Sequence, residues 1–319
     1  MPAPADVPAT ESTTGASTAF VALVTLVVVV VVVSSGCTGL SPAPTRGTVT
    51  TVVPAPTQGG VGGQAPASDQ PAAPDPPAVP DHLPLRDAEV FDRIAADLPA
   101  GSGLALAPVG RPDLVRTAGD PGPEVAWSTV KVPLAIAALR ARPDLTGVAQ
   151  QAITVSDNAA AETLWSALGG EPGAAAAVEA VMARAGDGAT RVPTSRLRPG
   201  YSIFGQTRWD LADQARFAAG LACLPDADPV LGMMTRIDPS QQWGLGRVPG
   251  AAFKGGWGPT ADGTGYLVRQ FGVIASDDGL VGVALSTHAP DLGSGAAQLS
   301  GIGDRIAAEV GNIGGGECG

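Results

Sequence analysis

A serine and a lysine stand three residues apart in the stretch Trp127-Ser128-Thr129-Val130-Lys131, where a helix is expected to begin. Residues three apart on a helix share one face, so the lysine amine can approach the serine hydroxyl. A hydroxyl becomes an effective nucleophile when a nearby base takes its proton. Ser128 and Lys131 therefore indicate a nucleophile and its proton acceptor.

Lysine is almost absent from the rest of the chain. Of the 19 Lys and Arg residues only two are lysines, Lys131 and Lys254. Arginine stays protonated, whereas burial or a neighbouring cation lowers the pKa of a lysine towards neutrality. A chain this rich in arginine is expected to keep lysine where a proton must be accepted, so both lysines are candidate functional residues.

Hydrophobic periodicity divides the chain after residue 83 into helices and strands. The expected helices are 85–98, one that starts at Ser128, 148–168, 173–185, 209–222 and 295–310. The expected strands are 103–109, 114–117, 251–257, 266–276 and 280–288. This order predicts an α+β fold, in which an antiparallel sheet carries the helices of both termini and a helical subdomain is inserted.

Two further short motifs follow the serine and lysine. Ser156-Asp157-Asn158 stands 28 residues after Ser128, within the expected helix at 148–168, and Lys254-Gly255-Gly256 stands 98 residues further on in an expected strand. The first tripeptide alone indicates a helix cap or a turn. The three motifs in this order, with a threonine in the usual third motif, are the signature of class A β-lactamases and penicillin-binding proteins.

On these residues the chain resembles the penicillin-recognising serine enzymes, and specifically their class A β-lactamase-like members. The similarity covers about residues 85–310 and includes residues 152–160, which are very like the family's helix at that point. The resemblance implies a β-lactamase-like fold, an acyl-transfer reaction without a cofactor, and a β-lactam or a peptidoglycan-like peptide as substrate.

The resemblance also implies a role for each catalytic candidate. Ser128 would be the nucleophile and Lys131 its proton acceptor. Ser156 would relay the proton towards the leaving group, and Asn158 would contact a substrate amide or hold Lys131. Lys254 would supply positive potential across the cleft.

The implied substrate-binding residues are Gly256, Trp257 and Arg269. The backbone N–H groups of Ser128 and Trp257 would form an oxyanion hole, in which one missing donor costs about 10²–10³ in rate. Arg269 lies ten residues before Gly279, where family members often place an arginine that holds the substrate carboxylate.

Composition argues against other classes of function. His82 and His288 are the only histidines, so a Ser-His-Asp triad is not expected. The net charge of −11 and the absence of a basic cluster argue against nucleic acid as a partner. No residues have the spacing of metal ligands. We expect a monomer.

One departure from the family pattern concerns the release of the acyl group. Class A enzymes hydrolyse the acyl-enzyme with a glutamate in an omega-shaped loop between the second and third motifs, but no glutamate occurs here between Glu179 and Glu309. Residues 191–206 occupy the place of that loop and supply no carboxylate. Asp210 and Asp213 are expected at a helix N-terminus, where carboxylates stabilise helices. Slow deacylation is therefore expected, rather than efficient β-lactam turnover.

Two more departures concern the shape of the site. Gly255 replaces the usual threonine or serine, which removes a hydroxyl that would bind the substrate carboxylate. The interval of 28 residues between the first two motifs is about half the usual one, so the helical subdomain must be shortened. A second class of function therefore stays open. In it, the chain is a catalytically inactive module that binds a cell-wall fragment or an envelope protein.

The N-terminal part predicts export. Residues 19–33 are apolar apart from Thr25 and precede Ser34-Ser35-Gly36-Cys37. This length suits the apolar core of an export signal. Small residues before a cysteine resemble a bacterial lipobox, which implies that Cys37 carries the lipid of a palmitate-modified lipoprotein. No Lys or Arg precedes the apolar run, so an uncleaved anchor and an unrelated apolar segment are the alternatives.

The chain is therefore expected to have three parts. Residues 1–37 are a signal peptide with its lipobox, 38–82 are a Pro/Ala/Gly-rich tether that cannot build helix or sheet, and 83–319 are the β-lactamase-like domain. The expected location is the extracytoplasmic face of the cell membrane, in the cell envelope.

Two cysteines remain once Cys37 is assigned to the lipid. Cys223 and Cys318 form an even pair in an oxidising compartment, and a disulfide between them would tie the helix at 209–222 to the C-terminal tail. The alternative is one buried thiol and one exposed thiol in the tail.

Overall fold

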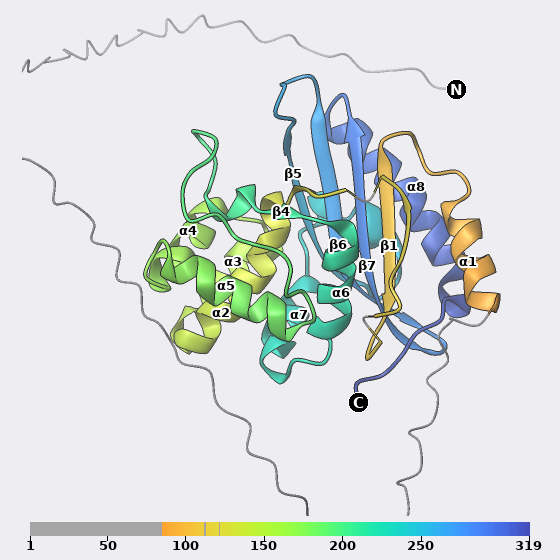
Figure 1. Ribbon diagram of the computed structural model, residues 1–319, viewed down its shortest axis with the longest axis horizontal. Coiled ribbons are helices and arrows are strands. Elements are labelled where there is room, and N and C mark those ends of the chain that lie inside the picture. The colour runs from red at the N-terminus through yellow and green to blue at the C-terminus, as the bar shows by residue number, and fades with distance from the viewer. Residues whose placement is uncertain (1–84, 112, 121) are drawn as a thin grey trace, which may run out of the picture. The chain divides into compact units, whose positions relative to one another are not determined.

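The computed structural model describes residues 85–111, 113–120 and 122–319, and their centre is a five-stranded antiparallel sheet (Figure 1). Its strands are β1 Ser102–Pro108, β2 Arg116–Gly119, β5 Ala252–Pro259, β6 Tyr266–Ser276 and β7 Gly279–Ala289. They lie in the order β2-β1-β7-β6-β5. A separate short ladder pairs β3 Glu124–Val125 with β4 Arg208–Trp209. Two sheet strands thus precede a long helical segment in the chain, and three follow it.

Helices cover both faces of the sheet. They are α1 Leu85–Ala95, α2 Lys131–Ala141, α3 Thr146–Thr154, α4 Asn158–Ala167, α5 Gly173–Arg184, α6 Leu211–Leu221, α7 Asp228–Met234 and α8 Leu292–Glu309. α8 packs against β6, β7 and α1, whereas α6 packs against β1 and β7, and α3, α4 and α5 surround α2 to one side (Figure 1). The predicted α+β fold, with its terminal helices on the sheet and an inserted helical subdomain, is confirmed.

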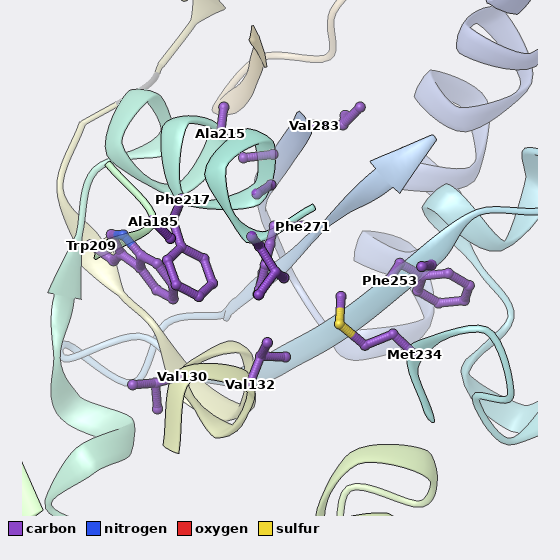
Figure 2. Close-up of a cluster of buried hydrophobic side chains, with 14 of the residues drawn as sticks. Val130, Val132, Ala185, Trp209, Ala215, Phe217, Met234, Phe253, Phe271 and Val283 are labelled. Carbon is purple, nitrogen blue, oxygen red and sulfur yellow. The ribbon is translucent and has the colours of Figure 1, made fainter. Parts of the chain in front are cut away.

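An aromatic cluster joins α6 to the sheet. The ring centroids of Trp209, Phe217 and Phe271 lie 5.3 to 5.6 Å apart, and all three side chains are fully buried (Figure 2). Such aromatic pairs contribute about 0.5–1.5 kcal/mol each beyond the area that they bury. The indole N–H of Trp209 donates to Asp187 Oδ2 at 2.8 Å, so its polar atom is satisfied inside the core. The cluster packs β4 and α6 against β6.

The expected continuous helix over 148–168 is wrong, because the chain breaks at Ser156. α3 ends at Thr154 and α4 begins at Asn158. Ser156 has a φ of 61°, which a helix does not allow, and Asp157 caps α4 by accepting a hydrogen bond from Ala160 N at 2.6 Å. The cap function of the tripeptide is thus real, and the break turns Ser156 out of the helix. The second strand also lies slightly later than expected, at Arg116–Gly119.

The disulfide between Cys223 and Cys318 is present, with Cα atoms 5.4 Å apart. It joins the end of α6 to the C-terminal tail, which also forms a bridge from Gly316 to Leu280 at the start of β7.

The predictions for residues 1–37, for Cys37 and for the tether at 38–82 fall outside the described residues. Within the described ranges no helix has both the length and the hydropathy needed to cross a membrane.

Candidate active site

Ser128 lies in a tight turn directly before α2. Trp127–Val130 form one 3-10 turn, which runs into α2 at Lys131. Trp127 has a φ of 50°, a left-handed conformation that costs a non-glycine residue about 1–3 kcal/mol. Thr129 is buried, while Ser128 stays partly exposed at a cleft. The backbone is thus held in an unfavourable conformation next to the serine, as is common at functional sites.

β5 runs directly beside this turn, and it does so because Gly256 has no side chain. A Cβ at this position would lie 2.8 Å from Ala126 O and from Ser128 N, and 2.9 Å from Thr129 N. No side-chain carbon tolerates such contacts with backbone atoms. The glycine therefore brings the strand, and with it the backbone of Trp257, next to Ser128, and both Ser128 and Trp257 line the cleft.

Gly256→Ala is expected to disturb the site through this contact. The added methyl group must push β5 away from the serine turn, and overpacking of this kind costs about 1–3 kcal/mol. We expect a lower melting temperature by calorimetry, together with weaker labelling of Ser128 by acylating probes. Gly301→Ala is the matched control, because a Cβ there meets nothing within 4 Å and α8 favours alanine. Equal melting temperatures for the two variants would contradict the expectation.

Lys131 is 1% exposed and lies among oxygen atoms of the second motif. Its Nζ donates to Ser156 O at 2.6 Å and to Asn158 Oδ1 at 2.7 Å, with longer contacts to Asp157 O at 3.3 Å and Ser156 Oγ at 3.4 Å. Burial lowers the pKa of Lys131 to about 8, against the opposing effect of the acidic groups nearby. The structure thus brings together Lys131, Ser156 and Asn158, and it gives the lysine a pKa at which it can exchange protons near neutral pH.

Lys254 reaches the same serine from the opposite side. Its Nζ donates to Ser156 Oγ at 2.9 Å and to Gly255 O at 2.8 Å, and its side chain is fully buried. Burial lowers the pKa of Lys254 well below its usual value, and the charge of Lys131 lowers it further. At the positive φ of Ser156, its hydroxyl lies within hydrogen-bonding distance of the amines of Lys131 and Lys254. The two lysines of the described chain therefore converge on a single side chain.

Ser128 itself is not hydrogen-bonded to Lys131. Both residues line the cleft, but within the described residues the Ser128 hydroxyl has no hydrogen-bond partner, and the Lys131 amine is directed at the second motif. The expectation that the helix face alone would pair the two groups is therefore not met in this structure. The Ser128 hydroxyl lines the cleft and is therefore available to a substrate or a water molecule.

The cleft has a volume of about 390 Å³, and part of its lining was not identified from the sequence. Its lining includes the aromatic side chains of Trp127, Tyr201, Trp257 and Tyr266. Glu162 also lines it, from one turn after Asn158 on α4. The spacing of four residues, which puts two side chains on one helix face, was the available signal for Glu162.

Arg269 does not reach the cleft. Its side chain is fully buried, and its guanidinium donates to backbone oxygens of Glu124 at 2.9 Å and Trp209 at 3.0 Å and to Gln214 Oε1 at 2.8 Å. Arg269 pairs with Gly256 and so shares its sheet face with Lys254, but β3, β4 and α6 hold its guanidinium there. The expected role in holding a substrate carboxylate has no support in this geometry. The residue instead ties β3, β4 and α6 together.

The position of Gly255 is also explained by packing. A Cβ there would lie 3.1 Å from the ring of Trp243, which packs edge-on against Trp257 with centroids 6.1 Å apart. The indole of Trp243 thus occupies the space that a side chain at position 255 would take.

Residues 191–206 cross the mouth of the cleft without contributing a carboxylate. Arg198 stacks its guanidinium 4.6 Å from the ring centre of Tyr201 and 5.7 Å from that of Trp127, and it donates to Pro259 O at 3.1 Å. These cation–π contacts fasten the segment to the serine turn. Asp210 caps α6 through Ala212 N at 2.8 Å, and Asp213 pairs with Arg216; neither carboxylate lines the cleft.

Solved structures share this fold at low sequence identity. The extended-spectrum β-lactamase TLA-3 is 13% identical with a TM-score of 0.56, over 71% of this chain and 98% of its own. A β-lactamase from Sphaerobacter thermophilus DSM 20745 is 20% identical with a TM-score of 0.51, over 70% and 96%. PBP-A is 18% identical with a TM-score of 0.51, over 71% and 96%. No protein-family model and no curated protein sequence matches the chain. The chain therefore shares the fold of these β-lactamases and of PBP-A.

Proposed function

We propose that the chain is a serine acyl-transfer protein of the cell envelope, in which Ser128 forms an acyl-enzyme with a β-lactam or a peptidoglycan-like peptide and releases the acyl group slowly. The observation that carries the proposal is the contact of Lys131 and Lys254 with Ser156 beside a cleft that contains Ser128. Burying a charged amine is costly. Packing alone therefore does not explain why two buried lysines meet at one hydroxyl.

The proposed reaction moves one proton from Ser128 through Lys131 and Ser156 to the leaving group, while Lys254 holds the Ser156 hydroxyl. Neutral Lys131 takes the proton of Ser128, whose Oγ attacks the acyl carbon. The backbone N–H groups of Ser128 and Trp257 bind the oxyanion. The carbon–nitrogen bond then breaks, and the leaving nitrogen takes a proton from Ser156, which regains one from Lys131, so that the amine of Lys131 is neutral again. The serine ester and a free amine result.

The test is covalent labelling. The full chain in detergent is incubated with a fluorescent penicillin and with an activated fluorophosphonate, and intact mass is recorded over time. We expect one adduct on the native protein and none on Ser128→Ala. The decay rate of the adduct separates a slowly releasing acyl-enzyme from a fast hydrolase. If the folded protein takes up neither probe at high concentration, the catalytic proposal fails.

Acylation is expected to rise with pH. Only the neutral form of Lys131 accepts a proton, and burial lowers its pKa to about 8. The second-order labelling rate should therefore increase about tenfold per pH unit below pH 8 and level off above it. Stopped-time labelling between pH 6 and 10 measures this profile. A rate that stays constant from pH 6 to 9 would exclude Lys131 as the titrating base.

The second candidate function is an inactive module that binds a cell-wall fragment or an envelope protein. It is favoured by the missing hydrogen bond between Ser128 and Lys131 and by the burial of Arg269 away from the cleft. In this case the cleft still binds cell-wall peptides, and Ser128→Ala binds them as tightly as the native protein in calorimetric titrations.

We also propose that Cys37 carries a lipid and that residues 38–82 tether the domain at 83–319 to the outer face of the membrane. The disulfide between Cys223 and Cys318 supports an oxidising compartment. Metabolic labelling with a palmitate analogue should mark the native chain and leave Cys37→Ser unmarked.

A further inference from the structure

Glu162 is the one carboxylate among the described residues that line the cleft. It lies on α4 one turn after Asn158, whose Oδ1 accepts from Lys131 Nζ at 2.7 Å. A helix rises about 5.4 Å per turn, so the two side chains are neighbours on one face. Glu162 thus stands on the same wall as the lysine contact and opens onto the same space as Ser128.

The Glu162 side chain is half-buried, and within the described ranges it makes no hydrogen bond or ion pair. Other carboxylates of the helical subdomain are engaged. Asp157 caps α4, Glu171 accepts from the indole of Trp165, and Glu179 accepts from Val192 N at 2.7 Å. Glu162 has no such structural task. A carboxylate that faces a cleft and has no protein partner is available to a water molecule.

We propose that Glu162 is the general base that hydrolyses the acyl-enzyme. The inference rests on the proposed acylation of Ser128, and it replaces release without a base by release assisted by Glu162, since residues 191–206 carry no carboxylate. A water molecule in the cleft gives a proton to Glu162, and its oxygen forms a bond to the acyl carbon. The bond between that carbon and Ser128 Oγ breaks, and the proton on Glu162 returns to Oγ. A free carboxylic acid and the resting serine result.

The surrounding charges fit this assignment. The negative charge of Glu162 raises the pKa of Lys131, opposing burial, so the two groups lie close enough to interact. A base on α4 is held by a helix instead of a loop, next to the amine that receives the serine proton. Two bases on one wall can serve the two halves of the reaction, with Lys131 acting in acylation and Glu162 in release.

The test separates the two half-reactions. The full chain, Glu162→Gln and Glu162→Asp are labelled with the fluorescent penicillin, and intact mass follows both formation and decay of the adduct. Glu162→Gln should form the adduct at the native rate at pH 9.5 and release it about 10²–10⁴-fold more slowly. Glu162→Asp should recover part of the release rate. Glu89→Gln is the matched control, because Glu89 is exposed on α1, far from the cleft lining, and it should behave as native.

Each remaining outcome is decisive. Native decay in Glu162→Gln, at an unchanged melting temperature, overturns the proposal. A variant that only shifts the pH profile of acylation to lower pH also overturns it, because the loss of a negative charge near Lys131 explains that shift alone. No adduct on the native chain removes the proposed function and this inference together, whereas an adduct that decays equally in all variants removes only the inference.

Discussion

Lys131→Ala is expected to slow acylation of Ser128 by about 10²–10⁴-fold, which is the usual contribution of a positioned general base. The Lys131 amine is almost fully buried, and its pKa is lowered to about 8. A substantial fraction of the amine is therefore neutral near physiological pH. No other group among the described cleft residues combines this pKa with a position beside Ser128. The rate of labelling by a fluorescent penicillin at pH 8 measures the effect directly.

Lys131→Arg provides the sharper comparison. Arginine keeps the positive charge but cannot be deprotonated in a protein, so it cannot accept the serine proton. We expect it to be as slow as Lys131→Ala. Both variants leave Ser156 O and Asn158 Oδ1 without their shortest donor, so their melting temperatures must be recorded beside the rates. Native labelling by folded Lys131→Arg would show that charge, and not proton transfer, is what this position supplies.

Removal of the disulfide between Cys223 and Cys318 is expected to give the largest change in stability. The bond closes a loop with a sequence separation of 95 residues. In the chain-entropy account, constraining a loop of this size stabilises by roughly 4–5 kcal/mol. For a domain of this size each kcal/mol corresponds to about 2–4 °C, so the melting temperature of Cys223→Ser/Cys318→Ser should fall by roughly 8–20 °C.

Calorimetry with and without a reducing agent tests this expectation. The reductant should lower the melting temperature of the native chain to that of the double variant, and it should leave the double variant unchanged. Cys37→Ser is the control, and it should respond to the reductant as the native chain does. A double variant that melts at the native temperature would contradict the expected contribution of the bond.

The order of elements and the three motifs could be predicted because they depend on local patterns. β6 and β7 are long apolar runs separated by a two-residue turn at Asp277 and Asp278, and Lys131 and Lys254 stand out by their rarity. The approach of both lysines to one hydroxyl was not predicted. It depends on the positive φ of Ser156, which the tertiary contacts impose against the preference of serine.

The error on Arg269 has a different origin. Its distance along the chain from Gly279 places it on β6, and its pairing with Gly256 puts its side chain on the same sheet face as that of Lys254. The sequence does not show that Glu124, Trp209 and Gln214 hold the guanidinium on that face, away from the cleft. The sequence did not indicate Glu162, because its shared face with Asn158 is meaningful only once α4 begins at Asn158 and that residue lines the cleft.

The two lysines come from distant parts of the chain, so the ribosome completes the site late in synthesis. Lys131 belongs to the inserted helical segment, and Lys254 belongs to a strand that the ribosome adds more than a hundred residues later. A nascent chain that ends before β5 contains the serine and the first lysine but neither the second lysine nor the strand beside the serine turn. Arrested chains of increasing length, exposed to a covalent probe, would therefore time the moment at which the late strands join the sheet.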